Sequence, residues 1–79
     1  MYYVYILESV LNAHHWYVGM TTDLQRRLAE HNAGESIHTN KFKPWRIKSY
    51  LAFTDKEKAE NFERYLKTQS GRAFAKKYL

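Results

Sequence analysis

The chain has 79 residues, no cysteine and a formal net charge of +5 at pH 7, from 13 Lys and Arg against 8 Asp and Glu. This length predicts one domain, residues 1–79, whose core is only just large enough to be stable alone. The absence of cysteine excludes disulfides and a cysteine nucleophile, and it is compatible with a reducing cytoplasm. We expect no membrane span and no signal peptide, because the apolar runs are short and MYYVYIL lacks a basic leader.

The basic residues are concentrated in two stretches. Residues 38–48, HTNKFKPWRIK, and residues 64–79 contain several Lys and Arg side chains and no acidic residue. Such clustering is typical of proteins that bind the phosphates of nucleic acid. We expect five basic residues to contact DNA, with RNA left open as a partner, namely Lys41, Lys43, Arg46, Lys67 and Lys76.

The first third of the chain predicts two strands. Residues 2–7 alternate, with Tyr3, Tyr5 and Leu7 on one side. Residues 15–20, HWYVGM, form a second strand after a loop, so an antiparallel hairpin is expected. Tyr5 and Tyr17 can then share a face, but the sequence leaves the register open.

The middle of the chain predicts a helix, a loop and a strand. Thr22 and Gln25 have the spacing of a capping box that starts a helix, and residues 32–34 end it. Residues 35–44 form a polar, basic loop. Residues 45–53, WRIKSYLAF, are rich in aromatic and aliphatic side chains and predict the third strand.

Two further helices complete the prediction. Thr54 and Glu57 repeat the capping-box spacing and open a helix that continues to about Lys67. Ser70 and Gly71 begin a short last helix. The order β-β-α-β-α-α predicts an α+β fold with a three-stranded antiparallel or mixed sheet flanked by helices.

Two cationic side chains lie on the apolar side of the first helix. At about 100° per residue, Arg27 and His31 fall on the same face as its leucines. Either both side chains reach water from the edge of the core, or this face borders a functional site. Arg26 and Glu30, on the opposite face, are expected to form a solvent-exposed pair.

The second long helix has a similar feature. Glu63 lies about 40° beyond Ala59, at the border of the apolar stripe. A carboxylate at the edge of a core is costly unless it meets a cation or a metal ion. One interpretation is a salt bridge from Glu63 to Arg27 or His31, and the other is a metal site.

Five side chains therefore occupy positions where a small domain would normally hold apolar or neutral groups, namely Tyr5, Tyr17, Arg27, His31 and Glu63. In order and spacing they resemble the GIY-YIG nuclease family. The similarity extends through YVYIL, WYVGMTTDLQRRLAEHN, KAENFERYLK and SGRAFAKKYL, and is close to the short, stand-alone bacterial members. YVY at 3–5 corresponds to the first triplet and YVG at 17–19 to the second.

The resemblance implies hydrolysis of phosphodiester bonds with one divalent metal ion, Mg²⁺ or Mn²⁺. By position, Tyr17 matches the tyrosine that takes a proton from the attacking water, and Tyr5 matches the one that positions water and substrate. Arg27 matches an arginine that stabilises phosphate charge, and Glu63 matches the glutamate that holds the metal ion. His31 matches a histidine of the same motif, and its role is left open between a phosphate contact and proton transfer.

Elementary chemistry limits these implied roles. An unperturbed tyrosine, with a pKa of about 10, is only about 0.1% ionised at pH 7, so a tyrosine base needs nearby positive charge. One carboxylate is a sparse metal site, but Mg²⁺ keeps several waters and takes substrate phosphate as a ligand. Gly19 matches the glycine of the second triplet, where backbone or substrate can approach closely.

The chain also departs from the family pattern. Tyr3 replaces the glycine of the first triplet, and SGRAFAKKYL lacks an asparagine that some relatives carry beyond the metal glutamate. Two functions are therefore weighed: a metal-dependent DNA endonuclease acting on branched, nicked or other structures, and a non-catalytic module that binds nucleic acid or joins a repair protein partner. The presence of Glu63 favours the enzyme. A module that only binds nucleic acid has no need of a carboxylate, because its negative charge would repel phosphate.

Overall fold

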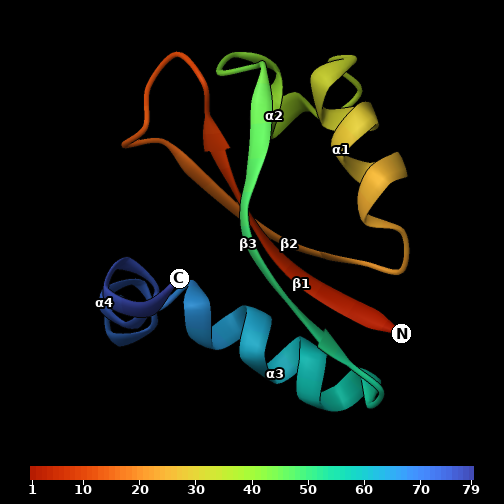
Figure 1. Cartoon of the computed structure of the whole chain (residues 1–79), viewed down its shortest axis with the longest axis vertical. Helices are drawn as coiled ribbons and strands as arrows, with labels where there is room; N and C mark the ends of the chain where they lie inside the picture. Colours follow the sequence, from red (N-terminus) through yellow and green to blue (C-terminus); the bar gives the residue numbers. More distant parts are fainter.

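A computed structural model describes all residues from 1 to 79. Three strands and four helices follow along the chain (Figure 1), namely β1 (Tyr2–Ser9), β2 (Trp16–Thr21), α1 (Leu24–Asn32), α2 (Ile37–Asn40), β3 (Trp45–Phe53), α3 (Lys56–Leu66) and α4 (Gln69–Tyr78). The expected order of strands and helices is confirmed. The one addition is the four-residue helix α2, which lies in the stretch expected to be a loop.

The strands form one antiparallel sheet in the order β2-β1-β3, which decides between an antiparallel and a mixed sheet. Strand β1 is central. Its residues Val4 to Leu7 are each no more than 2% exposed, because helices cover both faces of the sheet. A strand buried on both faces carries large apolar side chains at successive positions, as VYIL does.

The pairing of β1 with β2 fixes the register that the sequence leaves open. Tyr5 is opposite Gly19, and Leu7 is opposite Tyr17. Directly opposed residues of an antiparallel pair project to the same face of the sheet. Tyr5, Tyr17 and Gly19 therefore lie on one face.

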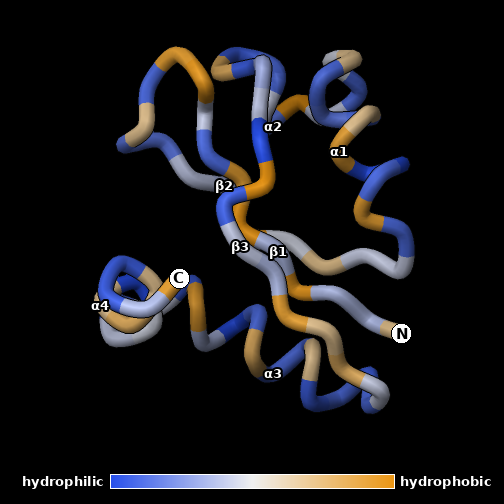
Figure 2. Tube along the Cα trace, viewed as in Figure 1, coloured by the Kyte–Doolittle hydropathy of each residue, from blue (hydrophilic) through white to orange (hydrophobic).

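Two hydrophobic cores lie on opposite faces of the sheet. Helices α1 and α2 cover one face, and α3 and α4 cover the other (Figure 1). The core under α3 and α4 contains Val4, Ile6, Ala59, Leu66 and Ala75, whereas the smaller core under α1 contains Tyr5, Leu7 and Trp45. Hydrophobic positions are accordingly frequent along the strands between the two helix layers (Figure 2).

The first turns of α1 and α3 differ from the capping boxes expected at Thr22 and Thr54. Asp23 caps α1 by accepting a hydrogen bond from the backbone N–H of Arg26, and Asp55 caps α3 by accepting from those of Glu57 and Lys58. In both places an aspartate directly follows the threonine. Its negative charge suits the partial positive charge of a helix N-terminus and gives a stronger acceptor than a hydroxyl.

Helix α4 begins one residue before the expected Ser70, with Thr68 as its cap. Gly71 allows this helix to start directly against the end of α3. A Cβ atom on Gly71 would lie 2.7 Å from the Cα of Leu66 and closer still to the carbonyl oxygen of Tyr65. Only a residue without a side chain permits such close backbone approach. None of the four helices is long and apolar enough to cross a membrane.

Candidate active site

Tyr5 is buried in the smaller core, and its ring lies over Gly19 of the neighbouring strand. Tyr5 is 2% exposed, and a Cβ atom on Gly19 would lie 2.6 Å from Tyr5 Cζ and closer to its oxygen. The missing side chain of Gly19 therefore makes room for the ring to extend across β2. The close approach predicted at Gly19 is made by a tyrosine of the protein itself.

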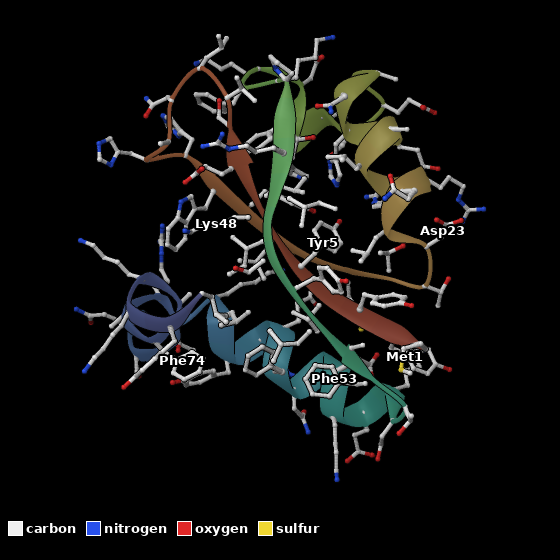
Figure 3. All side chains as sticks on the ribbon, viewed as in Figure 1. Met1, Tyr5, Asp23, Lys48, Phe53 and Phe74 are labelled. Carbon is white, nitrogen blue, oxygen red and sulfur yellow. The ribbon has the colours of Figure 1, made fainter.

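His31 holds the hydroxyl group of Tyr5 in place. Its Nε2 atom is 3.0 Å from Tyr5 Oη, and its Nδ1 atom is 2.7 Å from Thr39 Oγ1. His31 is fully buried, so of the two interpretations left open by the sequence, the one in which it reaches water from the edge of the core is wrong. Both ring nitrogens have partners inside the protein, which leaves neither atom for a phosphate in this arrangement. Tyr5, which contacts His31, lies between the sheet and α1 (Figure 3).

Arg27 lies one turn before His31 and is partly exposed. Its Nη1 atom is 2.9 Å from Glu30 Oε1, and 37% of its side chain is exposed. Arg26 also contacts Glu30, but at 3.8 Å. The expected pair of Arg26 with Glu30 is therefore confirmed, and Glu30 also pairs with Arg27 at the shorter distance, because an (i, i+3) partner is as near on a helix as an (i, i+4) one.

Tyr17 completes an aromatic group on this face of the sheet. It lies on the edge strand β2, with its ring centroid 6.4 Å from that of Tyr5 and 5.0 Å from that of His31. Tyr17 is half-buried, and its hydroxyl has no hydrogen-bond partner within the protein. Of the two tyrosines, Tyr17 is the more exposed.

Glu63 approaches from the other side of the sheet, on α3, which packs against β1 and β2. Its carboxylate pairs with Lys67 at 3.2 Å, and 23% of its side chain is exposed. The interpretation of Glu63 as a salt-bridge partner of Arg27 or His31 is wrong, since no such pair forms. Tyr5, Tyr17, Arg27 and His31 therefore gather on the α1 face of the sheet, whereas Glu63 belongs to the helix layer on the other face.

The pKa of Tyr5 is raised above its ordinary value, chiefly because burial disfavours the phenolate. The Arg27 guanidinium opposes this shift, whereas negative charge on Glu63, or on Tyr17 when it ionises, adds to it. Tyr5 is therefore a neutral phenol at physiological pH. It can donate or accept a hydrogen bond, but it is poorly suited to be a base.

The pKa of His31 is lowered, first by burial and then by the positive charge of Arg27, with Glu30 acting in the opposite direction. His31 is thus a neutral imidazole, with one nitrogen donating and the other accepting. Because the hydroxyls of Tyr5 and Thr39 can each donate or accept, this network is satisfied with either tautomer.

The buried His31 predicts an acid-sensitive fold. The unfolded chain takes up a proton on this residue as pH falls through about 6.5, whereas the folded protein does not, so the free energy of unfolding should decrease between pH 7.5 and 5.5. Urea denaturation at the two pH values measures this decrease. His31→Gln should reduce the difference, and His14→Gln, at an exposed histidine, should keep it. Equal pH dependence in both variants would contradict the assignment.

The five residues expected to bind nucleic acid do not form one surface. Arg46 is held by Glu8, with Nη2 to Oε1 at 2.8 Å, and Lys67 is held by Glu63. Lys41 and Lys43 are exposed near α2, and Lys41 lies 5.7 Å from the centroid of the Phe42 ring. Lys76 is exposed on α4, in a different region. Their role in binding stays a prediction.

Thr39 and Glu30 are the neighbours of the candidate site that sequence reasoning missed. Thr39 is fully buried, and its side chain and carbonyl bind His31 and the indole N–H of Trp45. It lies in a stretch dominated by polar and basic residues, and nothing in that pattern distinguishes it. Glu30 could have been found, because residues three apart on a helix are neighbours.

Comparison with known proteins agrees with this fold. Residues 1–78 match the family model described as the GIY-YIG catalytic domain. The chain therefore belongs to the GIY-YIG family, a family of nuclease domains, as the order of its site residues predicts.

Its relatives are small bacterial proteins. It is 39% identical over 72 residues to UPF0213 protein BH0048 of Halalkalibacterium halodurans, covering 90% of this chain and 74% of that protein. It is 37% identical over 70 residues to UPF0213 protein Reut_B5558 of Cupriavidus pinatubonensis, covering 87% and 76%. The solution NMR structure of BH0048 superposes with a TM-score of 0.56 at 34% identity, covering 95% of this chain and 82% of that one.

Proposed function

We propose that this protein is a metal-dependent endonuclease that hydrolyses phosphodiester bonds in DNA. The observation that supports this best is the division between the two tyrosines. Tyr5 is buried, hydrogen-bonded and held as a phenol, whereas Tyr17, on the same face of the sheet, is half-buried and forms no hydrogen bond with another residue through its hydroxyl. A nuclease needs one group that positions the attacking water or the phosphate and another that accepts a proton from the water.

In this proposal Tyr17 removes a proton from the attacking water. Tyr5, oriented by His31, positions water or a phosphate oxygen through its hydroxyl group. Because the Tyr5 phenol is fixed by burial and by one internal hydrogen bond, its orientation requires little reorganisation when substrate binds. His31 acts as the positioning residue for Tyr5, since both of its nitrogens are already bonded.

Arg27 is the group that binds the phosphate. Glu30 occupies one of its donors, and hydrogen bonding to that carboxylate is the first cause of the raised pKa of the guanidinium. The remaining donors of the planar fork face a partly exposed site and suit phosphate oxygens. Glu30 therefore orients Arg27 while leaving it able to stabilise charge that develops on the phosphate.

Glu63 is the residue that would hold a divalent metal ion. The donor set fits a weakly bound Mg²⁺ or Mn²⁺, since the protein supplies one half-buried carboxylate and no group of three acidic, His or Cys ligands. A bound ion would supply Lewis-acid stabilisation of the phosphate. Lys67, now 3.2 Å from Glu63, would have to release the carboxylate or share it.

A non-catalytic nucleic-acid-binding module is the second candidate. It is favoured by one observation: both charged groups of the site, Arg27 and Glu63, are engaged in ion pairs with other residues of the chain. Under this alternative the site would be an electrostatic surface and would bind DNA without cutting it.

The two candidates are separated by a cleavage assay. Labelled single-stranded, duplex, nicked and branched DNAs, with matched RNAs, are incubated with the protein in Mg²⁺, Mn²⁺ or EDTA. We expect cleavage of at least one DNA with metal and none in EDTA. Binding of these nucleic acids without cleavage under either metal would reject the enzyme and favour the binding module.

Tyr17→Phe tests the proposed base. The substitution removes one hydroxyl that has no partner in the protein, so the fold and the affinity for DNA should be unchanged. The cleavage rate should decrease by about 100-fold or more, within the range of general-base contributions. Tyr78→Phe, at a tyrosine that is 63% exposed on α4, is the matched control and should cut normally. Full activity of Tyr17→Phe would remove Tyr17 from the mechanism.

A further inference from the structure

A groove lies between the β1–β2 loop and helix α4, outside the candidate site. It consists of two neighbouring cavities of about 180 and 260 Å³, and Trp16 and Arg72 line both of them. The first cavity adds Leu66, Lys67 and Ala75, and the second adds His14 and Lys76. The loop and α4 lie on the same side of the molecule in Figure 1. We call this feature the Trp16 groove.

The Trp16 groove is lined by positive charge without any acidic side chain. Lys67, Arg72 and Lys76 line it, and no acidic residue does. Arg72 and Lys76 are exposed and form no ion pair in the structure. Two unpaired cations one turn apart on α4 make the groove complementary to a polyanion.

The groove also offers an aromatic surface that is held in place. The indole N–H of Trp16 donates to the carbonyl oxygen of Ala13 at 3.1 Å, and the ammonium group of Lys48 lies 5.2 Å from the centroid of the ring. Lys48, on β3, points to the same side of the sheet as α4 in Figure 3. A fixed indole flanked by cations is the arrangement with which proteins bind unpaired bases and their phosphates.

Size and position favour a single strand over a folded ligand. Each cavity is smaller than the about 300–1,000 Å³ of a typical small-molecule pocket, so it suits one base or one sugar-phosphate unit. Lys67 lines the groove and also pairs with Glu63, so the groove adjoins the candidate site. A nucleic-acid strand that leaves the candidate site along α4 would enter the Trp16 groove directly.

We propose that the Trp16 groove binds an unpaired, single-stranded segment of the nucleic acid, with a base against Trp16 and phosphates against Arg72 and Lys76. This inference rests on the proposed function only in naming the strand as part of the substrate. It assigns the protein a preference for DNA that carries a single-stranded region next to the scissile bond.

Binding without metal tests the groove separately from cleavage. Fluorescence anisotropy in EDTA measures the affinity for a labelled 12-nucleotide single strand and for a blunt duplex of equal length. Arg72→Gln combined with Lys76→Gln should weaken single-strand binding by about fivefold or more and reduce the salt slope by about 1.4. Lys56→Gln combined with Lys58→Gln removes the same charge from exposed positions at the other end of α3 and is the matched control.

Trp16→Leu tests the base contact. It should weaken single-strand binding by about 5- to 100-fold, the range for loss of one stacked base, and should abolish the quenching of Trp16 fluorescence on binding. Blunt-duplex affinity should change no more than in the control pair. If Trp16→Leu fails to fold, the Arg72 and Lys76 variant decides the question, because both of those side chains are exposed.

Each remaining outcome overturns one of the two proposals. Equal losses for single strand and duplex, equal losses in the control pair, or displacement of the strand by poly-glutamate at equal charge would overturn the groove as a site for unpaired bases. Groove-dependent binding by a protein that cuts nothing would leave the groove standing and reject the nuclease. If the protein cuts DNA with single-stranded ends and the groove substitutions do not alter that cleavage, the nuclease proposal stands and the groove proposal is rejected.

Discussion

Glu63→Gln should abolish cleavage while leaving nucleic-acid binding intact or tighter. The substitution keeps the shape of the side chain and removes the only carboxylate that the site offers a metal ion. Loss of metal-assisted stabilisation should slow cleavage by about 100-fold or more, equivalent to about 2.7 kcal/mol. Cleavage rate with saturating Mg²⁺ and anisotropy in EDTA measure the two effects separately.

The control for Glu63→Gln is Glu60→Gln, one turn earlier on α3. Glu60 forms no ion pair in the structure, so its loss should change neither cleavage nor binding by more than about twofold. The Glu63–Lys67 pair is partly exposed, so breaking it should alter the free energy of unfolding by only a few tenths of a kcal/mol, about the value of an (i, i+4) pair. Normal cleavage by Glu63→Gln would remove this residue from metal binding.

Gly19→Ala should destabilise the protein and disable the site through a single methyl group. Its Cβ atom would lie 2.6 Å from Tyr5 Cζ and 3.1 Å from Tyr17 Cε2, so the Tyr5 ring must move and lose its hydrogen bond to His31. Overpacking of this kind costs about 1–3 kcal/mol of the free energy of unfolding. Cleavage should fall by about tenfold or more, because Tyr5 would no longer be positioned. Urea denaturation and the cleavage assay report the two effects.

A double-mutant cycle isolates the steric cause. In a Tyr5→Leu background the closest ring is removed and only Tyr17 Cε2, at 3.1 Å, stays near the new Cβ atom, so Gly19→Ala should lower the free energy of unfolding by less than it does in the wild type. Gly19 has no left-handed backbone conformation, which removes strain as a competing explanation. An equal cost in both backgrounds would show that Gly19 is needed for a reason other than the Tyr5 ring.

The N-terminal caps of α1 and α3 and the ion pairs of Glu30 have one physical feature in common. Thr22 and Thr54 matched the capping-box pattern, but a neighbouring aspartate supplies the stronger acceptor in both helices. Glu30 pairs with Arg26 as expected, but its shorter contact is with Arg27. In each case the pattern identified the element correctly, and the choice between two adjacent partners depended on side-chain geometry that the pattern does not contain.

For the functional site, too, the sequence indicated the residues, and the structure was needed to show their contacts. The order of Tyr5, Tyr17, Arg27, His31 and Glu63 was enough to indicate the family, which the match over residues 1–78 bears out. The hydrogen bonds of His31 to Tyr5 and Thr39 join residues 26 and 8 positions apart in the chain. The ion pairs of Arg27 with Glu30 and of Glu63 with Lys67 replace the cross-helix pair that the sequence suggested.

By itself, the sequence determined the three strands, the three longer helices and their order, and it predicted the residues that a nuclease of this family would use. Those features follow from apolar periodicity, helix caps and motif spacing, which act over a few residues. Only the tertiary structure decided that Tyr5 lies over Gly19, that His31 is buried between Tyr5 and Thr39, and that α1 and α3 lie on opposite faces of the sheet. Strand register and helix packing control these facts, and both arise from contacts between residues far apart in the chain.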